Sequence, residues 1–297
     1  MENIIKFDTI GQYNAYYNHE TLHPVVSVID LSKGGIKQNA RMYFGFYIIY
    51  LKDIKCGNLR YGCNYYDYED GTLVFVAPGQ VMGIENKEYF QPQGYALLFH
   101  PDLIRGTSLG RHINDYTFFS YEVHEALHLS ESERKIIYDC FMKIESELKQ
   151  TIDKHSKTLI VANIDLFLSY CVRYYDRQFI TRDNANKGIL RRFETLLNDY
   201  FASEKPQLLG LPSVGYCAEQ LNLSANYFGD LIKKETGKSA QEYIQLKLMD
   251  IGKEKIFDMS KSVSEIAYEL GFKYPQHFSR SFKQHVGYSP NEYRRLN

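Results

Sequence analysis

The chain has 297 residues, a net charge of −1, and 44% apolar and 24% charged residues, a composition typical of a globular protein with room for two domains. No run is apolar and long enough to span a membrane, and the first residues lack the basic region and apolar core of a signal peptide. The five scattered cysteines favour a reducing cytoplasm over disulfides or a zinc site.

Residues 1–100 show the signals of β-strands, because short apolar or aromatic runs are bounded by turn residues. We expect strands at about 24–31, 42–52, 73–77 and 95–100. Many of the aromatic residues are tyrosines, which suit either the wall of a small-molecule pocket or ordinary strands. The clustered aromatic residues are Tyr43, Phe44, Phe46, Tyr47, Tyr50, Tyr61, Tyr65, Tyr66 and Tyr68.

Residues 101–180 predict helices. Ser130 and Glu133 form a capping-box pattern at the start of one helix, and a second should run over about 157–178. Its apolar residues, among them Ile164 and Leu168, exceed what one core-facing stripe requires, so either the sheet or a second copy of the chain could cover the excess. The polar stretch at 181–189 has no apolar periodicity, and we interpret it as a domain linker.

The most informative feature of the chain is an internal repeat. Residues 213–221 match 262–270 at a shift of 49, with Ser, Val, Ala and Leu in common. After one inserted residue the match continues at a shift of 50 between 228–243 and 278–293, where Phe, Lys, Gly, Ser and a Glu-Tyr pair coincide. A chance match of this density is improbable, so both segments should adopt the same local structure.

Each copy predicts a helix, a tight turn and a second helix. Ser262 and Glu265 have capping-box spacing at the start of the second copy. Gly271 stands where a left-handed residue would end that helix, and Asn222 takes this place in the first copy. This is the pattern of a helix-turn-helix, although a plain helical bundle remains an alternative on pattern alone.

The second helix of the second copy, about 275–286, should bury Phe278 and Phe282. Its other face is polar, and residues 271–297 carry five basic residues against one acidic residue. A local positive excess is expected of a surface that contacts phosphates. The residues left outside the core are Gln276, His277, Ser279, Arg280 and Lys283.

These segments resemble the signature of the AraC family of transcription regulators, over about residues 190–297. The resemblance implies two helix-turn-helix units joined by a long helix at about 240–257, which together bind double-stranded DNA. The matching segments are KKETG at 233–237, SVSEIAYELGF at 262–272, FSRSFK at 278–283 and GYSPNEYR at 287–294.

The resemblance also implies which side chains face the bases. In the first unit these are Asn226, Gly229 and Asp230, and in the second Gln276, Ser279 and Arg280, with His277 beside them. The first unit departs from the commoner family pattern, in which a polar residue is followed by Arg. Because an Asp can only accept from a cytosine or hold a neighbour, we expect the second unit to carry more of the direct readout. Candidates for phosphate contacts, or simply solvated charges, are Lys233, Lys273 and Lys283.

For residues 1–180 the resemblance implies a sensor and dimerisation domain, with a cupin-like β part at about 1–100 and helices at about 101–180. The expected fold class is therefore α+β, with an all-α DNA-binding domain at 190–297. Helices at 130–180 would form a homodimer. We expect that a small-molecule effector controls the protein. Control by a protein partner is the alternative. RNA polymerase is left open as a further partner.

An enzyme fused to a DNA-binding tail is a third interpretation. His100, His124 and His128 raise the question of a metal, but the metal-binding cupin pattern of two His one residue apart with a following Glu is absent. No nucleophile elbow, phosphate loop or dinucleotide fingerprint occurs either. We therefore expect no catalytic residues, metal or cofactor. The remaining candidate acids, which we expect at the surface, are Asp102, Asp115, Glu122 and Glu125.

Overall fold

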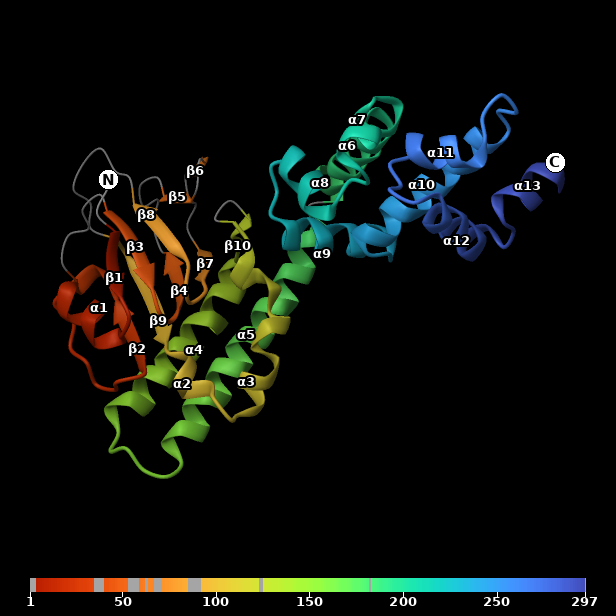
Figure 1. The fold of residues 1–297 in the computed structure, drawn as a ribbon. Helices are drawn as coiled ribbons and strands as arrows, with labels where there is room; N and C mark the ends of the chain where they lie inside the picture. Colours follow the sequence, from red (N-terminus) through yellow and green to blue (C-terminus); the bar gives the residue numbers. More distant parts are fainter. Residues whose placement is uncertain are drawn as a thin grey trace. The chain divides into compact units, whose positions relative to one another are not determined.

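The computed structural model describes residues 4–34, 40–52, 59–61, 64–66, 71–84, 92–122, 125–181 and 183–296. The chain divides into two compact units, Met1–Thr181 and Arg182–Asn297 (Figure 1). The first unit contains β-sheets and helices, and the described part of the second is helical, which confirms the α+β fold class. None of the helices in the described residues is long and apolar enough to cross a membrane.

The described strands of the first unit form two five-stranded sheets. Strand β1 pairs in parallel with β3, and the other pairs that we describe are antiparallel. One sheet has the order β1 (Ile4–Phe7), β3 (Ala40–Phe44), β8 (Val81–Ile84), β5 (Leu59–Tyr61) and β6 (Asn64–Tyr66). The other has the order β10 (Leu127–His128), β7 (Thr72–Val76), β4 (Tyr47–Lys52), β9 (Gly94–Phe99) and β2 (Val26–Asp30).

The four predicted strand regions all contain strands, but the run 42–52 is divided between the two sheets. The division falls at Gly45, whose backbone N–H donates to the carbonyl of Phe7 over 2.8 Å. A Cβ at Gly45 would lie 3.0 Å from the carbonyl oxygen of Asp8, so this crossing leaves little room for a side chain. The chain therefore leaves β3 and enters β4 of the opposite sheet at this position.

One aromatic core joins the two sheets, and helix α1 (Ile10–Tyr16) contributes to it. This helix lies in the region where only strands were predicted, and a capping box of Thr9 and Gln12 begins it. Inside the core the hydroxyls of Tyr13 and Tyr50 lie 3.3 Å apart. Burial raises the pKa of Tyr50 to about 12, so this hydroxyl stays protonated and can take part in hydrogen bonding.

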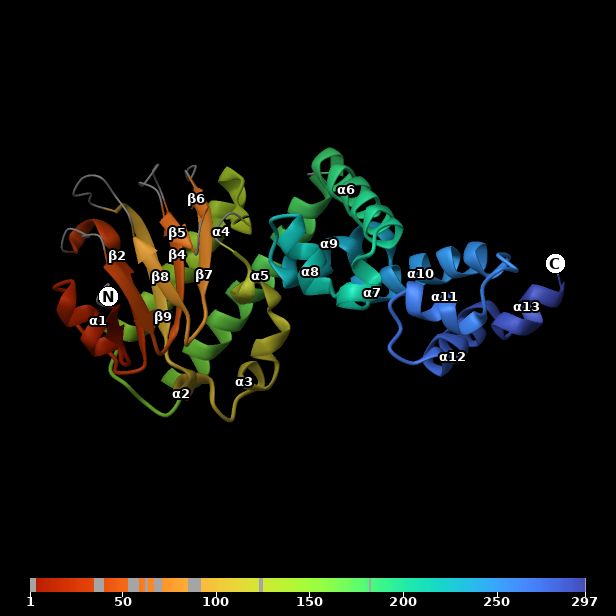
Figure 2. The same cartoon turned by 45° about the horizontal axis from the view of Figure 1, so that its top comes forward.

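Helices α4 (Glu131–Lys149) and α5 (Ser156–Thr181) pack against each other and contact the β10–β2 sheet (Figures 1 and 2). Helix α4 begins with the predicted capping box of Ser130 and Glu133. The rings of Phe141 and Phe167 meet edge to face between the two helices, with centroids 5.5 Å apart. Shorter elements precede them: η1 (Leu31–Lys33), α2 (Pro101–Ile104), α3 (Ser108–His112), η2 (Ile113–Asp115) and η3 (Thr117–Ser120).

The sequence suggested that Ile164 and Leu168 could form part of a dimer surface, and this is wrong for both residues. Each side chain is 0% exposed, because it faces the core of the first unit. The apolar residues that α5 leaves outside are Leu159, Leu166, Val172 and Ile180.

The stretch 181–189, which we interpreted as a domain linker, is largely helical, since α6 (Asp183–Ala202) begins within it. The long helix α10 (Ala240–Ile256) ends within one residue of the predicted position, and Figure 2 shows it between the flanking helices. The remaining helices are α7 (Lys205–Leu209), α8 (Val214–Gln220), α9 (Ala225–Thr236), α11 (Val263–Glu269), α12 (Pro275–Val286) and α13 (Pro290–Leu296).

Two leucines of α5 offer a matched test of its two faces. Leu168 is 0% exposed and Leu166 is 43% exposed. We expect Leu168→Ala to lower the free energy of unfolding of the first unit by about 2–5 kcal/mol, because it leaves a cavity in the core. Leu166→Ala should change it by less than about 1 kcal/mol. Urea denaturation followed by circular dichroism measures both, and equal losses would contradict the assignment of the faces.

Candidate nucleic-acid interface

Local hydrogen bonds position the first helix of each repeat. The Ser262 side chain accepts from the backbone N–H of Glu265, and the Glu265 side chain accepts from the N–H of Ser262, which confirms the predicted capping box. In the first copy Ser213 accepts from the N–H of Tyr216. The two helices, α11 and α8, therefore begin at equivalent positions of the repeat.

The turn between the two helices is left-handed in both copies, as predicted. The backbone φ is 57° at Asn222 and 91° at Gly271. The second helices of the two copies, α9 and α12, also end alike, with left-handed Gly237 and Gly287 as their C-caps. The internal repeat of the sequence is thus a repeat of structure, with two helix-turn-helix units.

Burial of aromatic side chains sets the orientation of α9 and α12. Phe228 of α9 and Phe278 and Phe282 of α12 are each 0% exposed. Because these rings occupy one side of each helix, the opposite side faces outward. Packing against α10 is close, since a Cβ at Gly252 would lie 3.3 Å from the ring of Phe278.

The predicted residues of α12 lie on its outward side. Gln276, His277, Arg280 and Lys283 are exposed, and Ser279 is half-buried. Exposed Lys273 precedes the helix, with its ammonium group 5.8 Å from the ring centre of Tyr274. The outward side of α12 therefore combines positive charge with several hydrogen-bonding groups.

The predicted residues of α9 also face outward, but with fewer donors. Asn226 and Lys233 are exposed, and Gly229 and Asp230 are half-buried. A Cβ at Gly229 would meet nothing within 4 Å, so the surface in front of it is open. Helices α9 and α12 thus present the predicted residues on comparable sides, and α12 carries more hydrogen-bonding side chains.

Sequence reasoning missed Tyr274, which lies at the N-cap of α12. Its side chain makes no capping hydrogen bond, and its ring meets that of His277 at 5.3 Å between centroids. The signal in the sequence was an aromatic residue between Lys273 and Pro275, just before the predicted helix. The structure shows that its side chain is half-exposed. Tyr274 can hold Lys273 and His277 in place beside the outward face.

Arg294 was counted among the basic residues of 271–297, but it has a structural role. Its guanidinium donates to the backbone carbonyls of Ile256, Asp258 and Lys261. These bonds attach α13 to the end of α10 and to the loop before α11. The exposed basic residues of 271–297 are therefore Lys273, Arg280, Lys283 and Arg295; the first three lie on or just before α12, and Arg295 lies in α13.

The histidines considered as metal ligands have other partners or lie outside the described residues. His100 caps α2 by accepting from the N–H of Asp102, and its Nδ1 lies 3.2 Å from the Asp102 carboxylate. His128 lies in β10 and donates its backbone N–H to Gln178, whereas His124 is outside the described residues. Within the described ranges no three His, Cys, Asp or Glu residues are grouped as metal ligands would be.

One expectation about the acidic residues was wrong. Glu125 is 1% exposed rather than at the surface, and its carboxylate accepts from the backbone N–H of Glu122. Asp102 and Asp115 are exposed, and Glu122 is half-buried.

The aromatic residues proposed for an effector pocket separate into two groups. Phe44, Phe46 and Tyr50 lie in the core between the sheets. Tyr47 stacks on Phe99 at 4.8 Å between ring centroids and contacts Phe119. Tyr68 and the side chains of Tyr61, Tyr65 and Tyr66 lie outside the described residues, and Tyr43 is half-buried.

Comparison with known proteins gives similarities concentrated in the second unit. A family model described as a helix-turn-helix domain matches residues 217–296. The uncharacterized transcriptional regulatory protein YesN of Bacillus subtilis (strain 168) is 38% identical over 79 residues, 26% of this chain and 22% of that protein. The probable transcriptional regulator LumQ of Photobacterium leiognathi is 25% identical over 196 residues, 65% of this chain and 68% of that protein.

A transcriptional regulator of Chromobacterium violaceum, titled as having an AraC-type DNA-binding domain, is 22% identical with a TM-score of 0.33, and the match covers 37% of this chain and 93% of that one. The match to YesN spans only about a fifth of that protein's length.

Glu269 provides a pH-dependent link between α10 and α11. Its carboxylate accepts from Lys261 over 2.5 Å and from Lys255 over 3.1 Å. These hydrogen bonds, that from Lys261 most strongly, hold the pKa of Glu269 below its usual value of 4.5. The stabilisation is therefore present above about pH 4.5 and is lost as the pH falls through the lowered pKa.

We expect Glu269→Gln to lower the free energy of unfolding of a fragment spanning 182–297 by about 0.5–1 kcal/mol at pH 7, a modest loss because the groups are partly exposed. As the pH falls through the lowered pKa of Glu269, the difference between the variant and the parent fragment should shrink, because protonation removes the charge that the lysines bind. Urea denaturation over a series of pH values from 7 downward provides the measurement. A loss that stays the same over the whole series would show that the ion pairs are not its cause.

Proposed function

We propose that this protein, whose C-terminal unit is an AraC-type DNA-binding domain, regulates transcription by binding a specific DNA sequence with α9 and α12. The observation that carries the proposal is the structural repeat. Each unit buries aromatic residues on one side of its second helix and turns a polar side outward. That is the arrangement with which a helix-turn-helix enters the major groove.

The length of α10 supports simultaneous reading by both units. Its 17 residues extend over about 26 Å. Together with the width of the units this suits reading helices in successive major-groove turns, which are about 34 Å apart on one face of the duplex. One chain could then read a site of two segments.

We assign direct base contacts mainly to α12, with Gln276, Ser279 and Arg280 facing the bases and His277 beside them. An Arg can donate twice to guanine, and a Gln twice to adenine, so these side chains can discriminate base pairs. On α9 the corresponding positions are Asn226, Gly229 and Asp230, which offer less. The lysines that would contact phosphates are Lys233, Lys273 and Lys283.

For the first unit we propose a cupin-like sensor that responds to a small molecule in the cytoplasm. The support is the aromatic interior between the sheets, where the hydroxyls of Tyr13 and Tyr50 pair and that of Tyr17 donates to the sulfur of Met42. Such an interior can offer both apolar contacts and hydrogen bonds to a ligand. Control by a protein partner is the alternative, and a melting shift in a metabolite screen would favour the small molecule. RNA polymerase is a further possible partner.

We also propose a homodimer formed through the outward side of α5. Leu159, Leu166 and Ile180 on this side are 45%, 43% and 63% exposed. They occur at intervals of 7 and 14 residues, the spacing with which one side of a helix meets a second helix. A second copy would cover this apolar side and present a second pair of helix-turn-helix units to a repeated operator.

The reading role can be tested on a duplex obtained by selection from random sequences. We expect Arg280→Ala to weaken binding to the selected duplex by about 1–3 kcal/mol and to bind random DNA nearly as before. Lys283→Ala should weaken binding to both and reduce the slope of log K against log salt by about one. Fluorescence anisotropy at several salt concentrations measures both effects. Equal losses on both duplexes for Arg280→Ala would refute direct readout by this residue.

The dimer can be tested with a charge on the exposed side of α5. Leu166→Glu should give a folded monomer with weaker binding to a repeated operator, because a buried unpaired carboxylate is costly in an apolar interface. Sedimentation velocity at micromolar concentration measures the association. Ile152→Glu is the matched control, since Ile152 is 60% exposed and lies outside α5. A parent protein that sediments as a monomer with and without operator DNA would rule the dimer out.

A further inference from the structure

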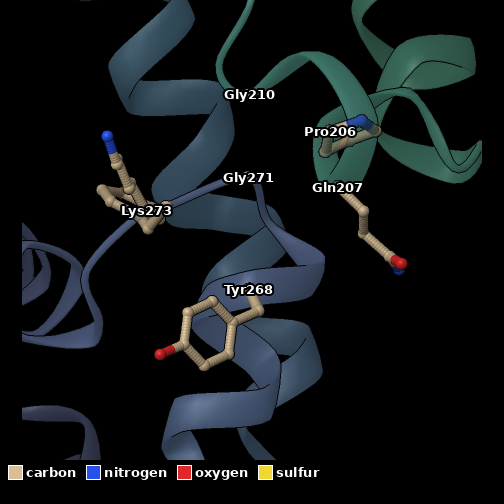
Figure 3. A pocket seen from close by; sticks show the side chains of 7 residues that line it. Pro206, Gln207, Gly210, Tyr268, Gly271 and Lys273 are labelled. Carbon is tan, nitrogen blue, oxygen red and sulfur yellow. The ribbon is translucent and has the colours of Figure 1, made fainter.

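Besides α10, a backbone contact links the second helix-turn-helix unit to the segment that precedes the first unit. The end of α7, at Gly210, meets the turn of the second unit at Gly271 (Figure 3). A Cβ at Gly271 would lie 2.8 Å from the carbonyl oxygen of Pro206 and 2.9 Å from the carbonyl carbon of Gly210. These are backbone atoms, so no rotamer change could make room for a side chain.

Both sides of this contact are held in place by other interactions. The hydroxyl of Tyr200 on α6 donates to the carbonyl of Gly210 over 2.9 Å. On the other side Lys255 of α10 and Lys261 pair with Glu269, immediately before the turn at Gly271. The contact therefore joins two anchored segments.

A groove of about 440 Å³ opens beside the contact, lined by Pro206 and Gln207 on α7 and by Tyr268 and Phe272 near the turn (Figure 3). Beside the groove, the close approach of the two segments at Gly271 is to backbone atoms of Pro206 and Gly210. The separation at this point is therefore set by the backbone and cannot be adjusted by side chains.

The consequence concerns geometry. Helix α10 alone would join the two units as a single rod, about which they could twist or bend. The contact at Gly210 and Gly271 adds a second connection, because α7 packs against α6 and α6 packs against α9. Two connections fix both the distance and the rotation between α9 and α12. We propose that the Gly210–Gly271 contact determines which spacing between the two DNA segments the chain accepts, with Gly271 as a positioning residue. This inference rests on the proposed function.

The test compares Gly271→Ala with Gly287→Ala in the full chain. Both glycines have similar left-handed φ angles, 91° and 89°, so an alanine at either position is strained at φ. A Cβ at Gly287 would meet nothing within 4 Å, whereas one at Gly271 would force the contact apart. The difference between the variants therefore isolates the contact from the strain.

Binding is measured on the selected duplex, on duplexes with either segment randomised, and on duplexes with one base pair added or removed between the segments. One base pair shifts the segments by about 3.4 Å and about 34°. We expect Gly271→Ala to bind the full duplex about tenfold more weakly than Gly287→Ala. It should bind duplexes with only one intact segment as Gly287→Ala does, and its preference for the original spacing should be reduced or shifted.

If Gly271→Ala does not fold, Tyr200→Phe provides the second variant, because it removes only the hydroxyl that holds Gly210. It should broaden the accepted spacing in the same direction. The inference is overturned if Gly271→Ala has the same spacing preference as Gly287→Ala. If Gly271→Ala does not fold, it is overturned if Tyr200→Phe has the same spacing preference as the parent. Either result would leave the proposed function standing. Failure of the parent protein to select any duplex would instead refute the proposed function.

Discussion

The arrangement of the second unit depends on the burial of three phenylalanines. Phe228, Phe278 and Phe282 are completely buried, and a short helix of 12 residues has little stability without such packing. Burial of a ring fixes the rotation of its helix about the helix axis, because side chains three or four residues away share its side. The polar side chains of α9 and α12 consequently face outward, and their orientation follows from the core rather than from any contact of their own.

The two copies of the repeat are alike where the local fold requires it and differ where the rest of the unit imposes a further condition. Both turns need a left-handed residue, and Asn suffices at exposed position 222. At 271 the backbone of Pro206 and Gly210 occupies the space of a side chain, so only glycine fits. Gly271 therefore differs from Asn222 because the turn of the second copy packs against the backbone of Pro206 and Gly210, whereas Asn222 is exposed.

Features that depend on neighbouring residues could be predicted from the sequence. The caps at Ser130 and Ser262 and the ends of α12 are local, and the structure has them as expected. Long-range relations could not be derived in the same way. Apolar periodicity shows that α5 has buried residues, but it cannot tell a sheet from a second chain as the cover, and so Leu168 was misplaced. Arg294 counted as a surface charge until its bonds to carbonyls 33 to 38 residues away were seen.

The net charge of −1 is a poor guide to the second unit because several of its acidic residues are bound in helix caps or ion pairs outside α12. Serine caps bond Glu242, Glu265 and Glu292, and these bonds lower the pKa of each carboxyl. Their negative charge therefore lies at helix N-termini, where it offsets the helix dipole. Glu269 is likewise taken up by two lysines. The positive charge of Lys273, Arg280 and Lys283 is then concentrated along α12, so the local field, rather than the total charge, attracts a polyanion to this side of the unit.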